Sequence, residues 1–272
     1  MTAVPPETTP MSPAAVAALG RPRLVEALVG AARLGLAGLV IVVGTAAVLA
    51  SAAVPLAPRG TRLALWTTTA AARALLAALG VRLTVEDCER LAAHRGFVFF
   101  NHFSWIDPVV LMAATPVRFL AAAGVRRLPF IGLMGRAVGT VFVNRGDGAS
   151  REAARDGLRA AIGTSATPVA LSPEGGVKPG PPVRPFRYGA FEVAAETDRP
   201  VLLVALRYTP WARAAWQDGE TLVDAAWRVG ARRGPFAASV APIGLVEAPA
   251  DAVEAQAADA ERVFNQALAE PR

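Results

Sequence analysis

The chain has 272 residues, a formal net charge of +6 and a sequence pI near 10.8. Its basic residues are spread along the chain without a basic run or an aromatic stacking motif, which argues against a nucleic-acid partner and favours anionic membrane phospholipids. Cys88 is the single cysteine, so no internal disulfide framework is possible, and no metal-ligand partner lies near it in sequence.

The N-terminal part begins with a tail and an apolar segment. Residues 1–20 combine four prolines with small residues, a composition that predicts a flexible tail. Residues 34–56 are 23 positions without a charge, and a helix of that length is about 34 Å long, enough to cross a hydrocarbon core of about 30 Å. Arginines flank this segment on both sides, so the sequence leaves open whether it spans the membrane or dips into one leaflet.

A second apolar segment covers residues 63–79 and is followed by Gly80, a residue typical of the position just past a helix. It predicts a helix that is either buried in the core or in contact with the membrane, with Trp66 at the level of the lipid headgroups. We interpret residues 21–80 as membrane-anchoring helices.

From residue 81 to residue 272, short β-rich runs alternate with helical stretches, which predicts a single α/β domain. Pro242 indicates that the last strand lies at an edge of the sheet. The predicted strands are residues 81–85, 97–100, 138–143, 168–171, 200–207 and 236–246, and the predicted helices are residues 108–114, 151–162, 186–195, 219–229 and 249–268.

Polar residues follow three of these strands. His102 comes after the buried run 97–100, Arg145 after the run 138–143, and Glu174 after the run 168–171. Ligands of open α/β sheets gather outside the carboxyl ends of the strands, so these three residues mark one edge of the sheet as the candidate site. Asp107 precedes Pro108 and is predicted to be the N-cap of the next helix.

His102 and Asp107 are five positions apart across this strand-to-helix turn. A hydroxyl is a poor nucleophile at neutral pH, so its reaction needs a base within hydrogen-bond reach. A carboxylate bonded to one imidazole nitrogen leaves the other nitrogen free to accept that proton. The alternative is a loop histidine beside a helix-capping aspartate. His94, the other histidine, lacks such a carboxylate and is expected to be a surface residue.

The segment from residue 101 to residue 107, Asn-His-Phe-Ser-Trp-Ile-Asp, resembles the first sequence block of the glycerolipid acyltransferase family, which includes 1-acylglycerol-3-phosphate acyltransferases. Residues 139–145 resemble the second block, residues 173–176 the third and residues 200–205 the fourth, in the family's order. The resemblance implies a His102 base oriented by Asp107, and substrate contacts from a further set of residues: Asn101, Ser104, Arg145, Glu174, Gly175 and Lys178.

The third block departs from the family pattern Pro-Glu-Gly-Thr-Arg. Gly176 replaces the threonine, Val177 replaces the arginine, and Lys178 follows one place later. Lysine lacks the bidentate fork of a guanidinium, which leaves the acceptor headgroup open between lysophosphatidic acid and a lyso-ornithine lipid or another lysolipid.

The resemblance further implies a mixed-sheet acyltransferase domain over residues 81–272, placed on the cytoplasmic face of the cell membrane by the preceding helices. The acyl donor would be acyl-CoA or acyl carrier protein, the partners would be membrane phospholipids and a lysolipid acceptor, and neither a metal nor another cofactor is expected. A lipid-binding protein without catalytic activity on the same fold is the alternative.

Overall fold

A computed structural model describes residues 13–144, 146–163, 166–178, 180–247 and 252–269. In this part of the chain a mixed seven-stranded sheet has the order β1-β7-β6-β2-β5-β3-β4, and only the β6–β7 pair is antiparallel. The predicted mixed α/β fold is confirmed. The strands are β1 (Arg82–Val85), β2 (Phe97–Phe100), β3 (Arg118–Ala122), β4 (Val141–Val143), β5 (Val169–Leu171), β6 (Val201–Thr209) and β7 (Ala237–Val246).

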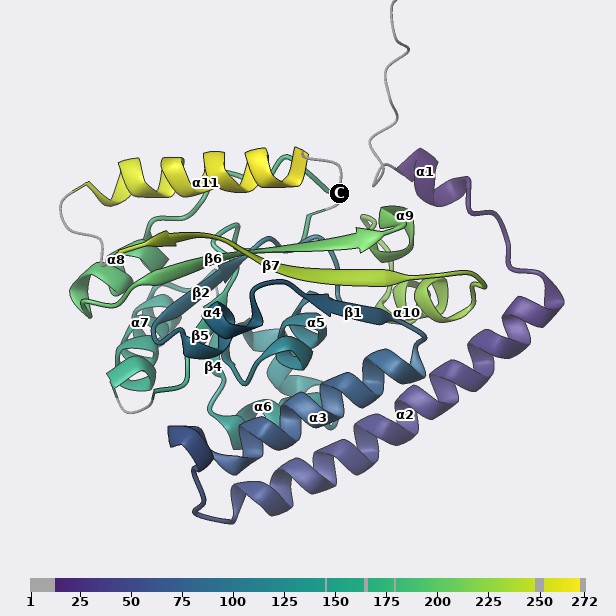
Figure 1. The fold of residues 1–272 in the computed structure, drawn as a ribbon, viewed down its shortest axis with the longest axis horizontal. Helices are drawn as coiled ribbons and strands as arrows, with labels where there is room; N and C mark the ends of the chain where they lie inside the picture. The colour runs from purple at the N-terminus through teal and green to yellow at the C-terminus, as the bar shows by residue number, and fades with distance from the viewer. Residues whose placement is uncertain (1–12, 145, 164–165, 179, 248–251, 270–272) are drawn as a thin grey trace, which may run out of the picture.

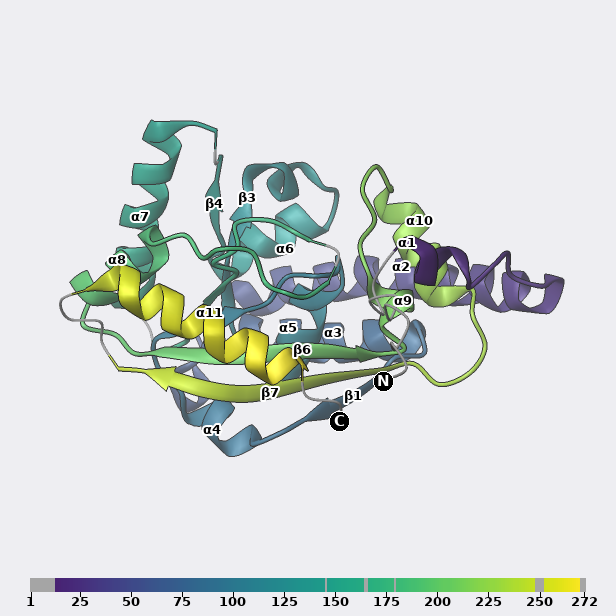
Figure 2. The same cartoon turned by 90° about the horizontal axis from the view of Figure 1, so that it is seen from above.

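Helices cover both faces of the sheet (Figures 1 and 2). All four residues of β2 are buried because alternate side chains enter two different cores: Val98 and Phe100 one, Phe97 and Phe99 the other. The helices of the domain are α4 (Cys88–Ala93), α5 (Asp107–Ala114), α6 (Ile131–Val138), α7 (Gly148–Gly163), α8 (Gly189–Glu196), α9 (Trp211–Ala214), α10 (Leu222–Gly230) and α11 (Val253–Ala269), with a 3-10 helix η2 (Ala123–Arg127).

The N-terminal segments form a helical hairpin beside this domain. The long helix α2 (Leu24–Ala52) and the helix α3 (Leu63–Ala78) lie side by side, joined through a 3-10 turn η1 (Pro58–Gly60) (Figure 1). By length and composition α2 can cross a membrane, and only 17% of its most apolar 18-residue window is buried. Such exposure of leucine and valine favours a place in lipid.

The two helices differ in how much they contribute to the core. One face of α3 is buried against α2 and α5, with Leu65 and Leu76 each 2% exposed, so that face is a core surface. Arg33 of α2 donates hydrogen bonds to the carbonyls of Gly230 (3.1 Å) and Arg232 (3.0 Å). These bonds tie the exposed helix α2 to the end of α10, and so fix the hairpin to the domain.

Several sequence expectations are corrected. Residues 13–17 of the predicted tail form a short helix α1 (Pro13–Ala17), while residues 1–12 lie outside the described part. The sequence predicts no element between residues 115 and 137, where the structure has β3, η2 and α6. His94 is buried rather than on the surface: its Nε2 lies 2.8 Å from the Phe97 carbonyl oxygen, and burial lowers the pKa of its imidazole.

The prediction that the last strand is an edge strand is also wrong, because β7 lies between β1 and β6. Its residues 237–240 pair with β1, and the pairing ends before Pro242. On the other side Pro242 lies opposite Val204, beside an irregularity in the register of β6 and β7. Pro242 therefore lies where the pairing with β1 has ended and the ladder to β6 is interrupted. At such a position no strand needs the backbone N–H that proline lacks.

Candidate active site

His102 lies two residues beyond β2, at the carboxyl end of the central strand. Its Nδ1 is 2.9 Å from Oδ2 of Asp107, and the side chains are 19% and 0% exposed. The ring of Phe100 meets the imidazole edge to face, with 5.8 Å between centroids. Within the described part of the chain no group hydrogen-bonds Nε2 of His102. The arrangement therefore holds the imidazole through Nδ1 and leaves Nε2 for a ligand.

Asp107 is not the N-cap that the sequence predicts. The helix α5 begins at Asp107 itself, with Ile106 in the cap position, and the carboxylate turns back toward the preceding loop. Its Oδ2 accepts hydrogen bonds from the backbone N–H groups of Phe103 and Ser104, both at 2.8 Å, as well as from His102. The backbone between the two residues thus wraps around the carboxylate, which fixes the His102–Asp107 pair.

The carboxylate of Glu174 supports His102 from the neighbouring strand. It follows β5, which pairs with β2, and its Oε1 accepts a hydrogen bond from the His102 backbone N–H at 2.9 Å. Its Oε2 accepts one from the Arg184 backbone N–H at 2.9 Å. The side chain is 3% exposed, and burial raises the pKa of its carboxyl group. Glu174 therefore holds two backbone segments together, and its contact with the acceptor stays a prediction.

Gly175 has a structural reason to be glycine. Its φ is +75°, a conformation that other residues rarely adopt, and a Cβ there would lie 2.4 Å from Nε of Arg187. The side chain of Arg187 thus crosses directly over this glycine. A substitution at Gly175 would displace Arg187, and the expected role of Gly175 in substrate binding stays a prediction.

Asn101 and Ser104 also face the protein interior instead of a substrate. The Asn101 side chain donates to the Leu206 carbonyl at 3.0 Å and accepts from the Leu206 N–H at 2.8 Å, which extends the β2–β6 ladder by one step. The Ser104 hydroxyl donates to the Ala214 carbonyl at 2.6 Å. Both side chains are 0% exposed. Both side chains therefore hold the loop that contains His102, and their contact with substrate stays a prediction.

The backbone of Lys178, and not its side chain, contacts His102. Its N–H donates to the His102 carbonyl at 2.9 Å, while its ammonium group donates to the Pro182 carbonyl. Arg145 lies outside the described residues. The strand that precedes Arg145, β4, is three positions from β2 in the sheet. At the usual distance between neighbouring strands, the axes of β4 and β2 are roughly 14 Å apart. The end of β4 is therefore farther from that of β2 than adjacent strand ends would be.

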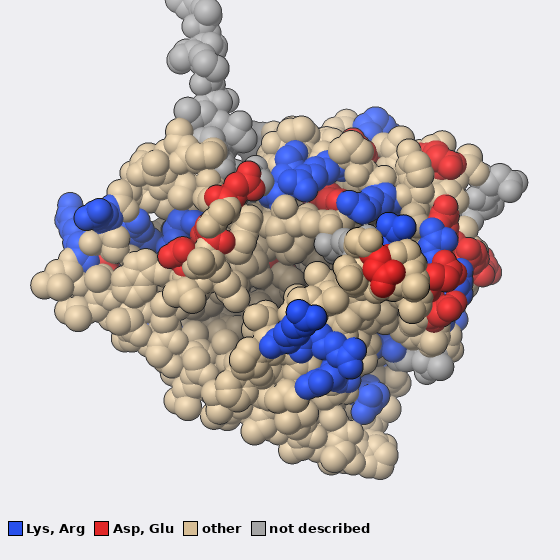
Figure 3. Space-filling model, turned by 180° about the vertical axis from the view of Figure 1, so that it is seen from behind, with Lys and Arg blue, Asp and Glu red and all other residues tan. Residues whose placement is uncertain are grey.

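On the face shown in Figure 3, basic side chains lie above and below a hollow, and acidic side chains lie at its sides. Two arginines that the sequence reasoning missed, Arg184 and Arg187, are exposed, and each is tied through its backbone to the turn at Glu174. In the described structure neither guanidinium has an ion-pair partner. Because both arginines are separated from the turn in sequence, the sequence alone did not indicate that they lie near it.

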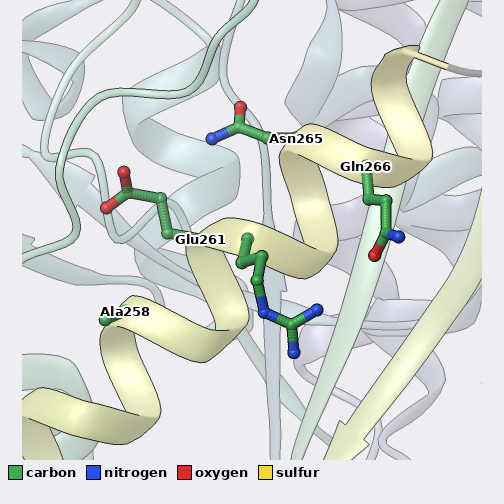
Figure 4. A pocket seen from close by; sticks show the side chains of 5 residues that line it. Ala258, Glu261, Asn265 and Gln266 are labelled. Carbon is green, nitrogen blue, oxygen red and sulfur yellow. The ribbon is translucent and has the colours of Figure 1, made fainter.

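A separate open pocket lies along α11 (Figure 4). Two of the side chains around it already bind the chain: Asn265 accepts from the Val183 N–H at 2.9 Å and Glu261 from the Phe186 N–H at 3.3 Å. These contacts hold the segment that continues to Arg184 and Arg187. His102 and Asp107 are not among the residues that line this pocket.

Comparison with known proteins relates one segment of the chain to a known family. A family model described as Acyltransferase matches residues 82–207, a range that includes His102, Asp107 and Glu174. This segment belongs to the Acyltransferase family. The resemblance found in the sequence blocks is thereby confirmed.

The acyltransferase segment is similar to several curated proteins. A 1-acyl-sn-glycerol-3-phosphate acyltransferase of Neisseria meningitidis serogroup B is 34% identical over 138 residues, 50% of this chain and 53% of that protein. A lyso-ornithine lipid O-acyltransferase of Rhodobacter capsulatus is 40% identical over 73 residues, 27% of this chain and 26% of that protein. The chain spans about half the length of the first of these relatives.

The fold is shared with a solved acyltransferase. The crystal structure of the 1-acyl-sn-glycerophosphate acyltransferase PlsC from Thermotoga maritima aligns with a TM-score of 0.70 at 20% identity, over 90% of this chain and 97% of that one. This agreement extends beyond the family segment. At this level of identity it establishes the architecture alone.

Proposed function

We propose that the protein transfers a fatty acyl group from a thioester to the free hydroxyl of a lysophospholipid. The observation that carries this proposal is the 2.9 Å contact between Nδ1 of His102 and the buried carboxylate of Asp107, at the carboxyl end of β2. Nε2 of His102 removes the proton of the acceptor hydroxyl while its oxygen attacks the thioester carbonyl. When the C–S bond breaks, the imidazolium returns the proton to the sulfur. Asp107 stabilises the imidazolium between these two steps.

The acceptor that we propose is 1-acyl-sn-glycerol-3-phosphate, and the product is phosphatidic acid. The exposed guanidinium groups of Arg184 and Arg187 support an anionic headgroup, because they have no carboxylate partner within the described chain and lie beside the turn that holds His102. Guanidinium groups bind phosphate oxygens through paired hydrogen bonds. Lys178 adds positive charge on the same segment. Arg145 stays a prediction as a phosphate contact.

A lyso-ornithine lipid is the second candidate acceptor. It is favoured by the similarity to lyso-ornithine lipid O-acyltransferases, which is 40% over 73 residues for the Rhodobacter capsulatus protein and 45% over 51 residues for that of Pseudomonas aeruginosa. These identities are higher than the 34% found for the 1-acyl-sn-glycerol-3-phosphate acyltransferase of Neisseria meningitidis, but they extend over fewer residues. Ornithine lipids lack a phosphate, so the two acceptors make different demands on Arg184 and Arg187.

The exposed apolar face of α2 supports attachment to the cell membrane, where the lysolipid is found. We place the domain on the cytoplasmic face, with acyl-CoA or acyl carrier protein as donor, because those thioesters are available there. Neither a metal nor another cofactor has a role in the proposed reaction.

The test is an acyl-transfer assay with the purified full chain. Labelled palmitoyl-CoA or palmitoyl carrier protein is supplied with 1-acyl-sn-glycerol-3-phosphate, lyso-ornithine lipid or lysophosphatidylethanolamine, and the lipid products are identified. We expect labelled phosphatidic acid from the wild type and none above background from His102→Ala. Label in none of the products with either donor would refute the proposed function, and a product only from lyso-ornithine lipid would replace the acceptor.

A further inference from the structure

The second oxygen of the Asp107 carboxylate has a partner that the reaction scheme does not use. Tyr208, near the end of β6, donates its hydroxyl hydrogen bond to Oδ1 of Asp107, while Oδ2 serves His102. The tyrosine is 1% exposed and lies 101 residues from Asp107 in sequence. The described contacts therefore form a chain from Tyr208 through Asp107 to Nδ1 of His102.

The ring of Tyr208 is held on several sides. It stacks on Phe236 at 6.1 Å between centroids and meets the edge of Trp211 at 5.5 Å. Its backbone is paired with Ala238 across the antiparallel β6–β7 ladder. A ring fixed in this way keeps its hydroxyl beside one carboxylate oxygen, since moving the whole ring away would break both ring contacts.

Burial, and then the negative charge of Asp107, raise the pKa of the Tyr208 hydroxyl well above its usual value. The hydroxyl therefore keeps its proton and remains a donor. A hydrogen bond to Oδ1 draws negative charge toward that oxygen and away from Oδ2. The carboxylate then attracts the Nδ1 proton of His102 less strongly than it would without Tyr208.

We propose that Tyr208 is a positioning residue that fixes the rotation of the Asp107 carboxylate and sets the basicity of His102 through it. This inference rests on the proposed function, because the proposed function assigns His102 as the base. The tyrosine touches neither substrate nor the reacting nitrogen; it acts only through Asp107. Losing its hydroxyl would leave more charge on Oδ2, stabilise the imidazolium and keep His102 protonated at higher pH.

The other charged groups around this chain of contacts are few in the described structure. On the loop after β5, Glu174 accepts from the His102 backbone N–H and Lys178 donates its backbone N–H to the His102 carbonyl. From α9, the Arg213 guanidinium lies over the Phe236 ring, 4.6 Å from its centroid, on which Tyr208 stacks. A change from Tyr208 to phenylalanine leaves all three groups in place and removes one hydroxyl.

The composition of the chain allows a direct measurement. It has two histidines and two tyrosines, so a histidine-labelled sample gives two imidazole signals in NMR, and the signal missing from His102→Gln belongs to His102. We expect Tyr208→Phe to raise the His102 pKa by about 0.5–1 unit, because only part of the effect of a hydrogen bond to the Asp107 carboxylate reaches His102. The acid limb of kcat/KM should move upward by the same amount, with KM for both substrates unchanged. Tyr188→Phe, at the exposed tyrosine, is the matched control and should shift neither.

An unchanged His102 titration in Tyr208→Phe would overturn the proposal. A loss of stability without a change in the titration would show that the Tyr208 hydroxyl has a structural role only. The NMR titration needs no substrate, so it decides the role of Tyr208 even if acyl transfer is not found. Should Tyr208→Phe fail to fold, 3-fluorotyrosine can be incorporated into a Tyr188→Phe background. Its more acidic hydroxyl is a stronger donor, so the His102 pKa should fall; an unchanged or higher value would contradict the proposal.

Discussion

Replacing Asp107 with asparagine removes one charge from the His102–Asp107 pair and nearly preserves its shape. Four donors converge on the carboxylate: Nδ1 of His102, the N–H groups of Phe103 and Ser104, and the Tyr208 hydroxyl. An asparagine oxygen in the place of Oδ2 can still accept the first three. Its amino group then faces the Tyr208 hydroxyl, which can rotate to accept a hydrogen bond.

The two effects of Asp107→Asn have different sizes. Three hydrogen bonds change from charge-assisted to neutral, which costs about 1 kcal/mol each, and the easier burial of a neutral group offsets part of that. We therefore expect the free energy of unfolding to fall by about 1–3 kcal/mol, with a Tm roughly 2–4 °C lower per kcal/mol. The imidazolium loses its carboxylate, so kcat should fall by roughly 10²–10⁴-fold.

The measurements are saturation kinetics in both substrates and thermal unfolding of the same samples. Asp259→Asn is the matched control, since Asp259 is exposed on α11 and pairs only with Arg262 among the described ion pairs. Asp259→Asn should leave kcat within about 2-fold of the wild type. Its free energy of unfolding should change by less than about 0.5 kcal/mol, as is usual for surface substitutions. If Asp107→Asn kept a near-normal kcat while its Tm fell, Asp107 would be a residue that organises the loop and no part of a catalytic pair.

Three further outcomes are expected. His102→Ala should lower kcat by roughly 10²–10⁴-fold with unchanged far-UV dichroism, because the side chain is partly exposed; turnover close to wild type would exclude it as the base. Because burial raises the pKa of Glu174, the folded chain binds the proton of this carboxyl group more tightly than the unfolded chain does. The contribution of Glu174 to the free energy of unfolding therefore falls as pH rises through the range between the folded and unfolded pKa values. Urea unfolding across pH should show that Glu174→Gln lacks this decrease. Arg187→Ala should raise KM for 1-acyl-sn-glycerol-3-phosphate several-fold more than KM for the acyl donor, whereas the control Arg262→Ala changes neither, and equal effects of Arg187→Ala on both substrates would show that Arg187 does not recognise the acceptor headgroup.

The strongest sequence predictions rested on local patterns. The run Phe97–Phe100 predicts a strand buried on both faces, and the structure places it in the middle of the sheet. The second apolar segment ends as predicted, with Gly80 at a φ of +73° just after α3. His102 and Asp107 meet because only a short turn separates them, so their spacing nearly determines their contact. Each of these features depends on residues close together in the chain, where periodicity and turn geometry act directly.

Other features required the assembled fold. Asn101, Ser104 and Glu174 were predicted to bind substrate because they belong to the sequence blocks that resemble the family, yet each of them bonds to the backbone of a segment far from it in the chain. A polar side chain near a site must find a hydrogen-bond partner if it is buried, and sequence does not show which side chains are buried. The helix that begins at Asp107 instead of after it is a similar case, since its carboxylate found donors in the preceding loop.

The sequence by itself determined the His102–Asp107 pair, the apolar N-terminal segments and the alternation of strands and helices, because these depend on spacing and hydrophobic pattern. The tertiary structure alone decided what surrounds the pair. Strand order brings Tyr208 of β6 onto Asp107, and the segment after Glu174 returns to lay Arg187 over Gly175. Such contacts join residues separated by up to 101 positions, and they form only when the sheet has set the order of its strands.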